Sequence, residues 1–127
     1  MASLTAIIVD DEPGLAELFS DLLELQMVKI VGIGHTGMDA LRLVNAKNPN
    51  IVFLDINMPK MDGIEALKEI KKINLAPKVV MVTGNKYVNK KELFQFGADA
   101  LIFKPFKMEQ ILDVLEKIEG SMVPLGS

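Results

Sequence analysis

The chain has 127 residues with a formal net charge of −3, of which 50% are hydrophobic and 24% charged, and it contains no cysteine and one histidine. This balance predicts one globular domain and argues against direct nucleic-acid binding, disulfides, thiolate chemistry and a histidine-rich metal site. No apolar run approaches the roughly 20 residues of a membrane span and the N-terminus lacks a signal-peptide pattern, so we expect a soluble, cytoplasmic domain without membrane insertion.

Apolar runs alternate with helical periodicities through the first half of the chain. Pro13 suits the first turn of a helix, whose apolar residues recur at spacings of three and four up to Gln26. Thr36 with Asp39 three residues later resembles a capping box, which predicts the start of a second helix, and Gly63 precedes a third. The predicted strands of this half lie at 6–9, 28–33 and 51–54.

The second half continues the alternation. The predicted elements are strands at 79–82 and 101–103, a helix at 90–96 and a last helix that begins near Met108. We expect the last helix to stop at Gly120, because glycine is typical of the position after a helix, and to leave Val114 outside its buried face. That face consists of Met108, Ile111, Leu112, Leu115 and Ile118.

Five strands that alternate with five helices predict a fold of the α/β class, a doubly wound parallel sheet with helices on both faces. The sequence contains no internal repeat and no second domain. We expect one domain over residues 1–120, followed by a short flexible tail at 121–127.

Polar residues come directly after four of the five predicted strands. Asp10 and Asp11 follow the first strand, Asp55 follows the third, Thr83 follows the fourth and Lys104 follows the fifth. Parallel strands end at a shared edge of their sheet, where open α/β folds place their ligands. The sequence therefore predicts that these five side chains meet in one site.

The chemistry of this set indicates phosphoryl transfer to an aspartate. Converging carboxylates repel one another, so one of them titrates high unless a cation binds, and oxygen ligands suit Mg²⁺. A carboxylate such as Asp55 also serves as a nucleophile that forms an acyl phosphate. Thr83 and Lys104 then suit the remaining phosphoryl oxygens, which carry the negative charge of the transferring group.

A glycine motif offers a competing interpretation as a small dinucleotide-binding domain. It consists of Gly32-Ile33-Gly34-His35-Thr36-Gly37, which matches G-x-G-x-x-G between a strand and a helix. Asp55, about 20 residues further on, would then bind the ribose. The motif does not start the sheet, however, and this interpretation leaves the other polar strand ends unexplained. Glycines in a tight turn, with His35 as a turn residue, are the expected alternative.

The sequence resembles the CheY-like receiver domains of two-component response regulators along its whole length. The matching stretches are Val9-Asp10-Asp11-Glu12-Pro13, Leu54-Asp55-Ile56-Asn57-Met58-Pro59-Lys60-Met61-Asp62-Gly63, Val82-Thr83-Gly84, and Gly97-Ala98-Asp99-Ala100 continuing to Lys104-Pro105-Phe106. The resemblance implies a flavodoxin-like sheet with strand order 2-1-3-4-5. It also implies a signalling phosphoacceptor with intrinsic self-phosphorylation and slow autodephosphorylation, and not an enzyme for a free metabolite. A receiver-like module that works without phosphorylation is the further alternative.

The resemblance also implies roles for the site residues. Asp55 is the phosphoacceptor. Asp11 and Asp55 bind Mg²⁺ directly, the backbone carbonyl of Asn57 is a third protein ligand, and Asp10 acts through a metal-bound water, with Mn²⁺ as an acceptable substitute. The phosphoryl donor is a phosphohistidine on a histidine kinase or a histidine phosphotransfer protein.

The remaining implied roles concern phosphoryl contacts, access and switching. Thr83 and Lys104 contact the phosphoryl group, and Lys104 forms a cis peptide bond with Pro105. Gly84 leaves room for the donor histidine, and side chains at the positions of Asn57 and Asn85 tune hydrolysis.

One residue departs from the family pattern. Leu101 stands where receivers usually carry a switching tyrosine or phenylalanine, and Phe103 is expected on the same side of its strand. An output partner is expected on the surface of the helix at 90–96, the strand at 101–103 and the last helix. The chain is expected to be a monomer or to dimerise weakly on phosphorylation.

Overall fold

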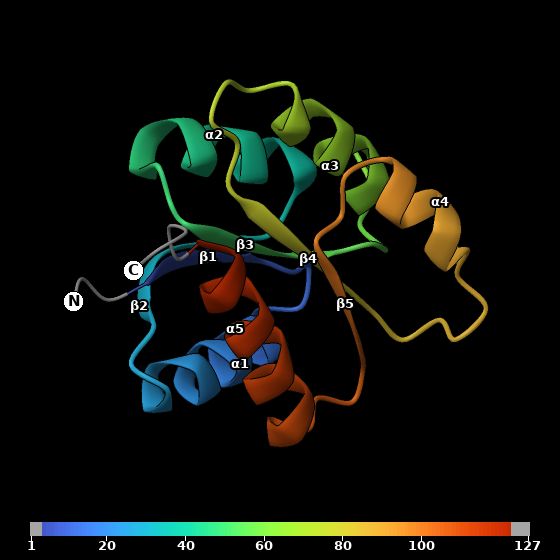
Figure 1. Cartoon of the computed structure of the whole chain (residues 1–127). Helices are drawn as coiled ribbons and strands as arrows, with labels where there is room; N and C mark the ends of the chain where they lie inside the picture. Colours follow the sequence, from blue (N-terminus) through green and yellow to red (C-terminus); the bar gives the residue numbers. More distant parts are fainter. Residues whose placement is uncertain (1–3, 123–127) are drawn as a thin grey trace.

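A computed structural model describes residues 4–122, in which strands and helices alternate along the chain (Figure 1). The strands are β1 (Thr5–Val9), β2 (Lys29–Gly34), β3 (Ile51–Asp55), β4 (Lys78–Thr83) and β5 (Ala100–Phe103). The helices are α1 (Pro13–Leu25), α2 (Gly37–Lys47), α3 (Gly63–Lys71), α4 (Lys90–Gln95) and α5 (Met108–Met122). Each element matches a predicted one to within a few residues, apart from the end of α5.

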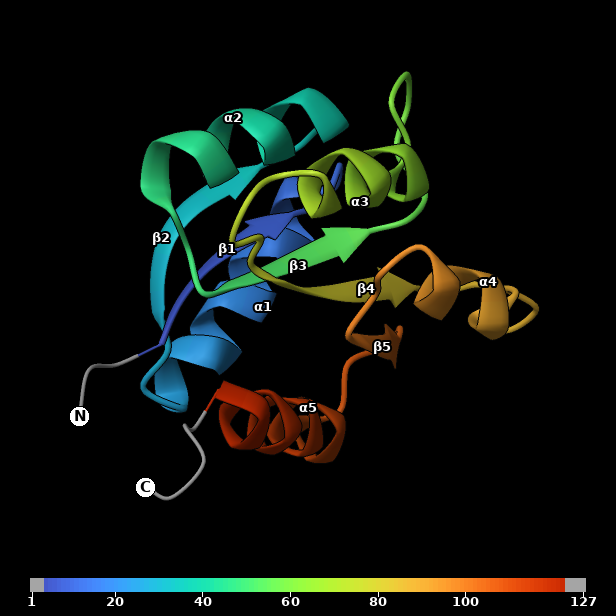
Figure 2. The same cartoon turned by 45° about the horizontal axis from the view of Figure 1, so that its top comes forward.

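The five strands form one parallel sheet in the order β2-β1-β3-β4-β5. Helices α2, α3 and α4 cover one face and α1 and α5 cover the other (Figure 1). The predicted α/β fold class and the strand order implied by the resemblance are both confirmed. Because all strands run the same way, their carboxyl ends lie along one edge of the sheet, as the strand arrows in Figure 2 show.

Side chains of the central strands alternate between two hydrophobic cores. Ile8 and Phe53 point toward α1 and α5, whereas Ile7 and Leu54 point toward α2 and α3. All residues of β3 are buried, as expected for a parallel strand that is covered on both faces. This packing fixes the register of β1 and β3, and therefore the positions of the residues that follow them.

Three helices begin with a side-chain cap. The Thr36 hydroxyl accepts a hydrogen bond of 3.0 Å from the backbone N–H of Asp39, as the capping pattern predicts. Asp62 accepts one of 2.9 Å from the N–H of Glu65 at the start of α3. Asn89 caps α4 in the same way. The Asp62 cap also anchors the far end of the loop that begins after β3.

The end of the last helix differs from the prediction. Helix α5 continues to Met122, so Gly120 does not end it and the predicted domain limit at residue 120 lies inside the helix. Val114 is buried, at 7% exposure, whereas Leu112 is 42% exposed. Leu112 fits a helical repeat with Met108 and Leu115, and Val114 fits one with Ile111 and Ile118. The orientation of α5 on the sheet decides that Val114 is the buried one. The rest of the predicted tail, 123–127, lies outside the described residues.

A charge-compensated cluster lies at the amino edge of the sheet. The Asp99 carboxylate accepts hydrogen bonds of 2.8 Å from Lys71 Nζ and 2.9 Å from the Val79 N–H. Lys78 Nζ lies 3.8 Å from its other oxygen. One carboxylate is thus paired with two ammonium groups. Across residues 4–122, no helix has the length and apolar composition needed to cross a membrane.

Candidate functional site

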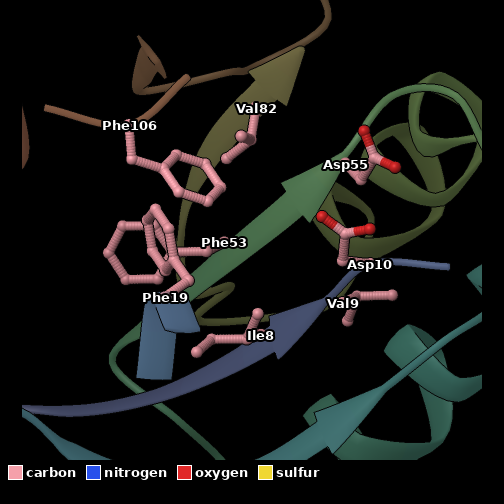
Figure 3. A pocket seen from close by; sticks show the side chains of 8 residues that line it. All are labelled: Ile8, Val9, Asp10, Phe19, Phe53, Asp55, Val82 and Phe106. Atoms are coloured by element: carbon pink, nitrogen blue, oxygen red, sulfur yellow. The ribbon is translucent and has the colours of Figure 1, made fainter. Parts of the chain in front are cut away.

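The candidate site lies at the carboxyl edge of the sheet, where β1 and β3 end side by side. Asp10 follows β1 and Asp55 ends β3, and the two residues are only 4% and 3% exposed. Their carboxylates are neighbours at the tips of these strands (Figure 3). Asp11 is exposed, and an oxygen from each of the three carboxylates lies within 4.8 Å of the others. The predicted convergence of these three acids is confirmed.

Lys104 places an ammonium group in contact with two of these acids. Its Nζ lies 3.0 Å from Asp10 Oδ2 and 3.5 Å from Asp55 Oδ1. The backbone N–H of Lys104 donates a hydrogen bond of 2.8 Å to the carbonyl of Thr83, which ties the end of β5 to the end of β4. The predicted cis peptide bond between Lys104 and Pro105 is present.

Thr83 joins the same edge but is fully buried, at 0% exposure. Its hydroxyl oxygen accepts a hydrogen bond of 3.0 Å from the backbone N–H of Asn85. The Asn85 side chain in turn accepts one of 2.9 Å from the N–H of Tyr87. Thr83 therefore lies at the base of the β4–α4 loop, and a change in its position would be transmitted directly to that loop.

The rim of the site is open. Asn57, Gly84 and Asn85 are exposed, and a Cβ added to Gly84 would meet only the Cβ of Lys104, at 3.9 Å. Gly63 closes the other side, where a Cβ would collide with the carbonyl oxygen of Asp55. Glycine is required there because the start of α3 approaches the backbone of the site directly.

Burial and like charges raise the pKa of Asp55 from 3.8 to about 6. Burial is the largest cause. The ammonium of Lys104 acts in the opposite direction, and the charges of Asp10 and Asp11 add to the rise. Burial also acts to lower the pKa of Lys104, but its hydrogen bond to Asp10 and the charge of Asp55 outweigh this, so the pKa of the ammonium is raised. The negative charge of the three carboxylates is therefore only partly offset by the ammonium of Lys104.

This donor set fits a hard divalent cation. Three carboxylates with one ammonium leave excess negative charge, and the available ligand atoms are all oxygens. Mg²⁺ typically binds one or two carboxylates together with water and phosphate oxygens. A cation here would stabilise the charged form of Asp55 against burial, which is the largest cause of its raised pKa, and against the repulsion from Asp10 and Asp11. The residues therefore fit the metal that the sequence predicts.

Three phenylalanines close the site on its apolar side. The ring of Phe19 lies 4.9 Å from that of Phe53 and 4.4 Å from that of Phe106, measured between centroids, and Figure 3 shows these rings to the left of the two carboxylates. The cavity that they line with Asp10 and Asp55 measures about 10 Å³, about the size of one water molecule. A larger ligand must therefore approach the carboxylates from the open rim.

The glycine motif is filled by the protein itself. Gly32 and Gly34 lie within the edge strand β2. A Cβ at Gly34 would lie 2.6 Å from the Cβ of Asp39, and one at Gly37 would lie 2.6 Å from the carbonyl oxygen of Met61. The start of α2 is already capped by Thr36. These contacts favour tight packing over a pyrophosphate site.

An aliphatic side chain, Leu101, occupies the position where the resemblance implies a switching aromatic residue. Leu101 is partly buried and packs on the α2–α3–α4 side of the sheet, in the cluster that contains Leu93 of α4. Phe103 lies on the same side, as predicted, with Lys90 Nζ 5.3 Å from its ring centroid. Leu101 and Phe103 therefore both contact the region of α4.

His35, which is predicted only as a turn residue, also borders the site. Its Nδ1 lies 2.8 Å from the carbonyl oxygen of Asp10. The one signal in the sequence is its position directly after the strand next to β1. That signal does not reveal a contact with Asp10, because the contact depends on how far β2 extends.

The chain matches the family model described as response regulator receiver domain over residues 6–116. It is 32% identical over 112 residues to the chemotaxis protein CheY of Bacillus subtilis (strain 168), with 87% of this chain and 93% of CheY covered. It is 34% identical over 113 residues to the probable C4-dicarboxylate response regulator DctR of the same strain, with 87% of this chain covered. The chain spans about half the length of DctR, 50%.

Solved structures give the same result. The CheY-like receiver domain from Methylobacillus flagellatus is 28% identical and superposes with a TM-score of 0.85, covering 92% of this chain and 99% of that one. A DNA-binding response regulator of the LuxR family from Staphylococcus aureus is 33% identical with a TM-score of 0.82, covering 91% and 98%. Receiver domains are signalling phosphoacceptors that generally bind Mg²⁺ at an acidic pocket. This chain belongs to the receiver domain family of two-component response regulators.

Proposed function

We propose that this receiver accepts a phosphoryl group on Asp55 in a Mg²⁺-dependent reaction and then releases it slowly by hydrolysis. The donor is a phosphohistidine of a histidine kinase or of a histidine phosphotransfer protein. The observation that carries the proposal is the arrangement of three carboxylates around one lysine at the carboxyl edge of the sheet. Asp55 is the acid at the end of the central strand β3.

In this proposal Asp11, Asp55 and the backbone carbonyl of Asn57 hold Mg²⁺, and Asp10 holds it through a water molecule. Mn²⁺ has the same preference for oxygen ligands and would substitute. The bound cation offsets the negative charge that spreads over the phosphoryl oxygens during transfer. Asp10 keeps a second role, because its carboxylate already binds Lys104 and the backbone N–H of Glu12.

Phosphoryl transfer exchanges one bond to phosphorus for another. An Asp55 carboxylate oxygen attacks phosphorus and forms the new P–O bond, while the P–N bond to the donor histidine breaks and its electron pair stays on the imidazole nitrogen. In hydrolysis, a water oxygen attacks phosphorus and the bond to the Asp55 oxygen breaks. The products are the Asp55 carboxylate and inorganic phosphate. With a pKa of about 6, Asp55 is mostly ionised and nucleophilic at neutral pH.

Lys104 and Thr83 are proposed to hold the phosphoryl oxygens. Lys104 Nζ lies 3.5 Å from Asp55 Oδ1 and would bind a phosphoryl oxygen there as a positive point charge. Thr83 would donate its hydroxyl proton after a small shift of the β4–α4 loop. The exposed Gly84 leaves the approach of the donor histidine open, and Asn57 and Asn85 on the rim would tune access of water to the phosphoryl group.

The output is proposed to act through the face of α4, β5 and α5. Phosphorylation would draw Thr83 toward Asp55 and shift the population of conformations at this face. At this face Leu101 is an aliphatic residue in the place where receivers usually carry a switching tyrosine or phenylalanine. Phe94 and Leu112 provide exposed apolar area there, at 47% and 42%. We propose a monomer or a weak dimer on phosphorylation, without direct nucleic-acid contacts, and a cytoplasmic location in keeping with the lack of cysteine.

Acetyl phosphate with MgCl₂ tests the acceptor. Intact-mass analysis should show one added phosphoryl group on the wild-type chain, and none after chelation with EDTA or in Asp55→Ala. Asp62→Asn is the matched control, because Asp62 caps α3 a few residues away; this variant should still be labelled. Label that persists in Asp55→Ala would refute Asp55 as the acceptor.

Two other results would redirect the proposal. Saturable binding of NADH to the wild-type chain would support the glycine motif as a dinucleotide site. A chain that binds its partner protein equally well in the wild-type form and in Asp55→Ala, and that takes no label from acetyl phosphate or from a cognate kinase, would be an interaction module that works without phosphorylation.

A further inference from the structure

His35 makes a hydrogen bond that ties the β2–α2 turn to the acidic site. Its Nδ1 lies 2.8 Å from the backbone carbonyl oxygen of Asp10. A carbonyl oxygen only accepts hydrogen bonds, so Nδ1 carries the proton and donates it. The imidazole therefore holds the main chain at the residue where β1 delivers its acids to the site.

The contact replaces a bond that the sheet does not make. The Asp10 N–H donates a hydrogen bond of 3.0 Å to the carbonyl of Gly34, the last residue of β2. One further step of the parallel ladder would give the Asp10 carbonyl the backbone N–H of Thr36. The chain turns into α2 instead, where the N–H of His35 donates to Asp39 Oδ2 over 2.9 Å. The imidazole supplies the donor that the strand end lacks.

This carbonyl controls the direction of Asp11. The Asp10 carbonyl belongs to the planar peptide that joins Asp10 to Asp11, so a hydrogen bond to it fixes the plane from which Asp11 extends. The Asp10 carboxylate is already held by Lys104 and by the N–H of Glu12. Asp11 is exposed and therefore gains most from a fixed backbone.

We propose that His35 is a positioning residue of the cation site, which raises Mg²⁺ affinity by holding the Asp10–Asp11 peptide so that Asp11 faces Asp55. This inference rests on the proposed function, in which these aspartates bind Mg²⁺. Outer partners that orient metal ligands typically contribute about 10-fold or more in metal affinity. His35 acts through backbone geometry and touches neither the metal nor the phosphoryl group.

Isothermal titration with MgCl₂ measures this role. His35→Phe keeps the ring and removes the donor, and His35→Ala removes both. Both variants should bind Mg²⁺ about 10-fold more weakly than the wild type. His35→Asn should recover most of the affinity, because its amide nitrogen occupies nearly the same place as Nδ1. The titration needs no phosphorylated protein.

Thr36→Ala is the matched control for damage to the turn. It removes the cap of α2 next to His35 and should lower the melting temperature without changing Mg²⁺ affinity. In acetyl phosphate reactions, the His35 variants should need more Mg²⁺ for half-maximal labelling but reach the wild-type rate at saturation.

Unchanged Mg²⁺ affinity in both His35→Phe and His35→Ala would overturn the inference and leave His35 a turn residue. An equal loss in Thr36→Ala would overturn it too, because the effect would then belong to the turn as a whole. If the wild-type chain binds no Mg²⁺, the proposed metal site fails together with the inference. Wild-type binding with unaffected His35 variants rejects the inference alone.

Discussion

The two edges of the sheet carry opposite arrangements of charge. At the amino edge, Asp99 is paired with Lys71 and Lys78 and also accepts a backbone N–H. At the carboxyl edge, the three acids of the candidate site share the single ammonium of Lys104. Both edges belong to the same sheet, so the contrast comes from the residues placed at each edge, with Lys71 of α3 contributing to the amino edge.

The difference separates a structural cluster from the proposed functional one. The amino edge is satisfied by the protein alone, and it stabilises the junction of α3, β4 and β5. The carboxyl edge keeps excess negative charge, which the protein alone does not neutralise. Local conflicts of this kind are expected at functional sites, where stability is given up for binding or catalysis. Substitutions at the two edges should therefore have opposite effects on stability.

The largest expected effect is at the amino edge. Asp99→Ala should lower the free energy of unfolding by about 2–3 kcal/mol, because it leaves the Val79 N–H without its acceptor and removes the carboxylate that pairs with Lys71 and Lys78. Urea denaturation measures the loss. Mg²⁺ affinity should stay at the wild-type value. Asp99→Asn, which keeps one acceptor oxygen, should lose less, and an equal loss would assign the effect to charge and not to the hydrogen bond.

The next effect has the opposite sign. Asp55→Asn should stabilise the metal-free protein at about pH 8 by about 1–2 kcal/mol, because it removes a carboxylate whose pKa is raised from 3.8 to about 6. The folded state holds the Asp55 proton more tightly than the unfolded state. The contribution of wild-type Asp55 is therefore most favourable below about pH 4 and is lost as the pH rises through 6.

Denaturation of both proteins across this pH range measures the difference. Asp55→Asn and wild type should have nearly equal stability at about pH 4 and should diverge up to about pH 7. Asp21→Asn, an exposed acid on α1, is the control and should show no such divergence. If Asp55→Asn proved less stable than the wild type at about pH 8, this would contradict the interpretation that the site carries excess negative charge.

Bound Mg²⁺ should offset the excess negative charge at the carboxyl edge and so bring its charge balance closer to that of the amino edge. At ten times its dissociation constant, Mg²⁺ should add about 1.4 kcal/mol to the stability of the wild type, visible as a higher melting temperature. Asp11→Asn and Asp55→Asn should lose most of this gain, whereas Asp99→Asn should keep it. An equal Mg²⁺ gain in all three variants would indicate nonspecific screening and no site.

The smallest expected effect concerns the ammonium group of Lys104. Lys104→Met should raise the pKa of Asp55 above its value of about 6, because Lys104 is the main group that lowers it. An NMR titration of the Asp55 carboxyl carbon measures the pKa directly. A pKa that stays unchanged would mean that Lys104 does not lower the pKa of Asp55 and contributes only to phosphoryl binding.

Much of the site follows from the sequence because strand ends are local features. Asp10, Asp55, Thr83 and Lys104 each follow an apolar run, and the parallel sheet then brings them together. The Thr36 cap is equally local, since it joins residues three positions apart. The direct contacts of Lys104 with two acids follow from the strand order, which the family resemblance supplied and the apolar pattern alone did not.

Other features depend on packing that no local pattern contains. Leu112 and Val114 both fit a helical repeat, and only the orientation of α5 on the sheet buries Val114 and exposes Leu112. The helix also continues two residues past Gly120, to Met122, and a glycine inside a helix is tolerated at a cost of about 1 kcal/mol relative to alanine. The contact of His35 with Asp10 depends on where β2 ends relative to β1.

The sequence by itself determined the alternation of five strands and five helices, and it predicted the class of chemistry and the residues that we propose carry it. These properties reside in short apolar runs and in the residue types that end them. The tertiary structure alone decided the balance of charge at each edge, the raised pKa of Asp55 and the position of His35 beside Asp10. Burial and electrostatic coupling are sums over residues distant in sequence, so they exist only once the sheet has formed.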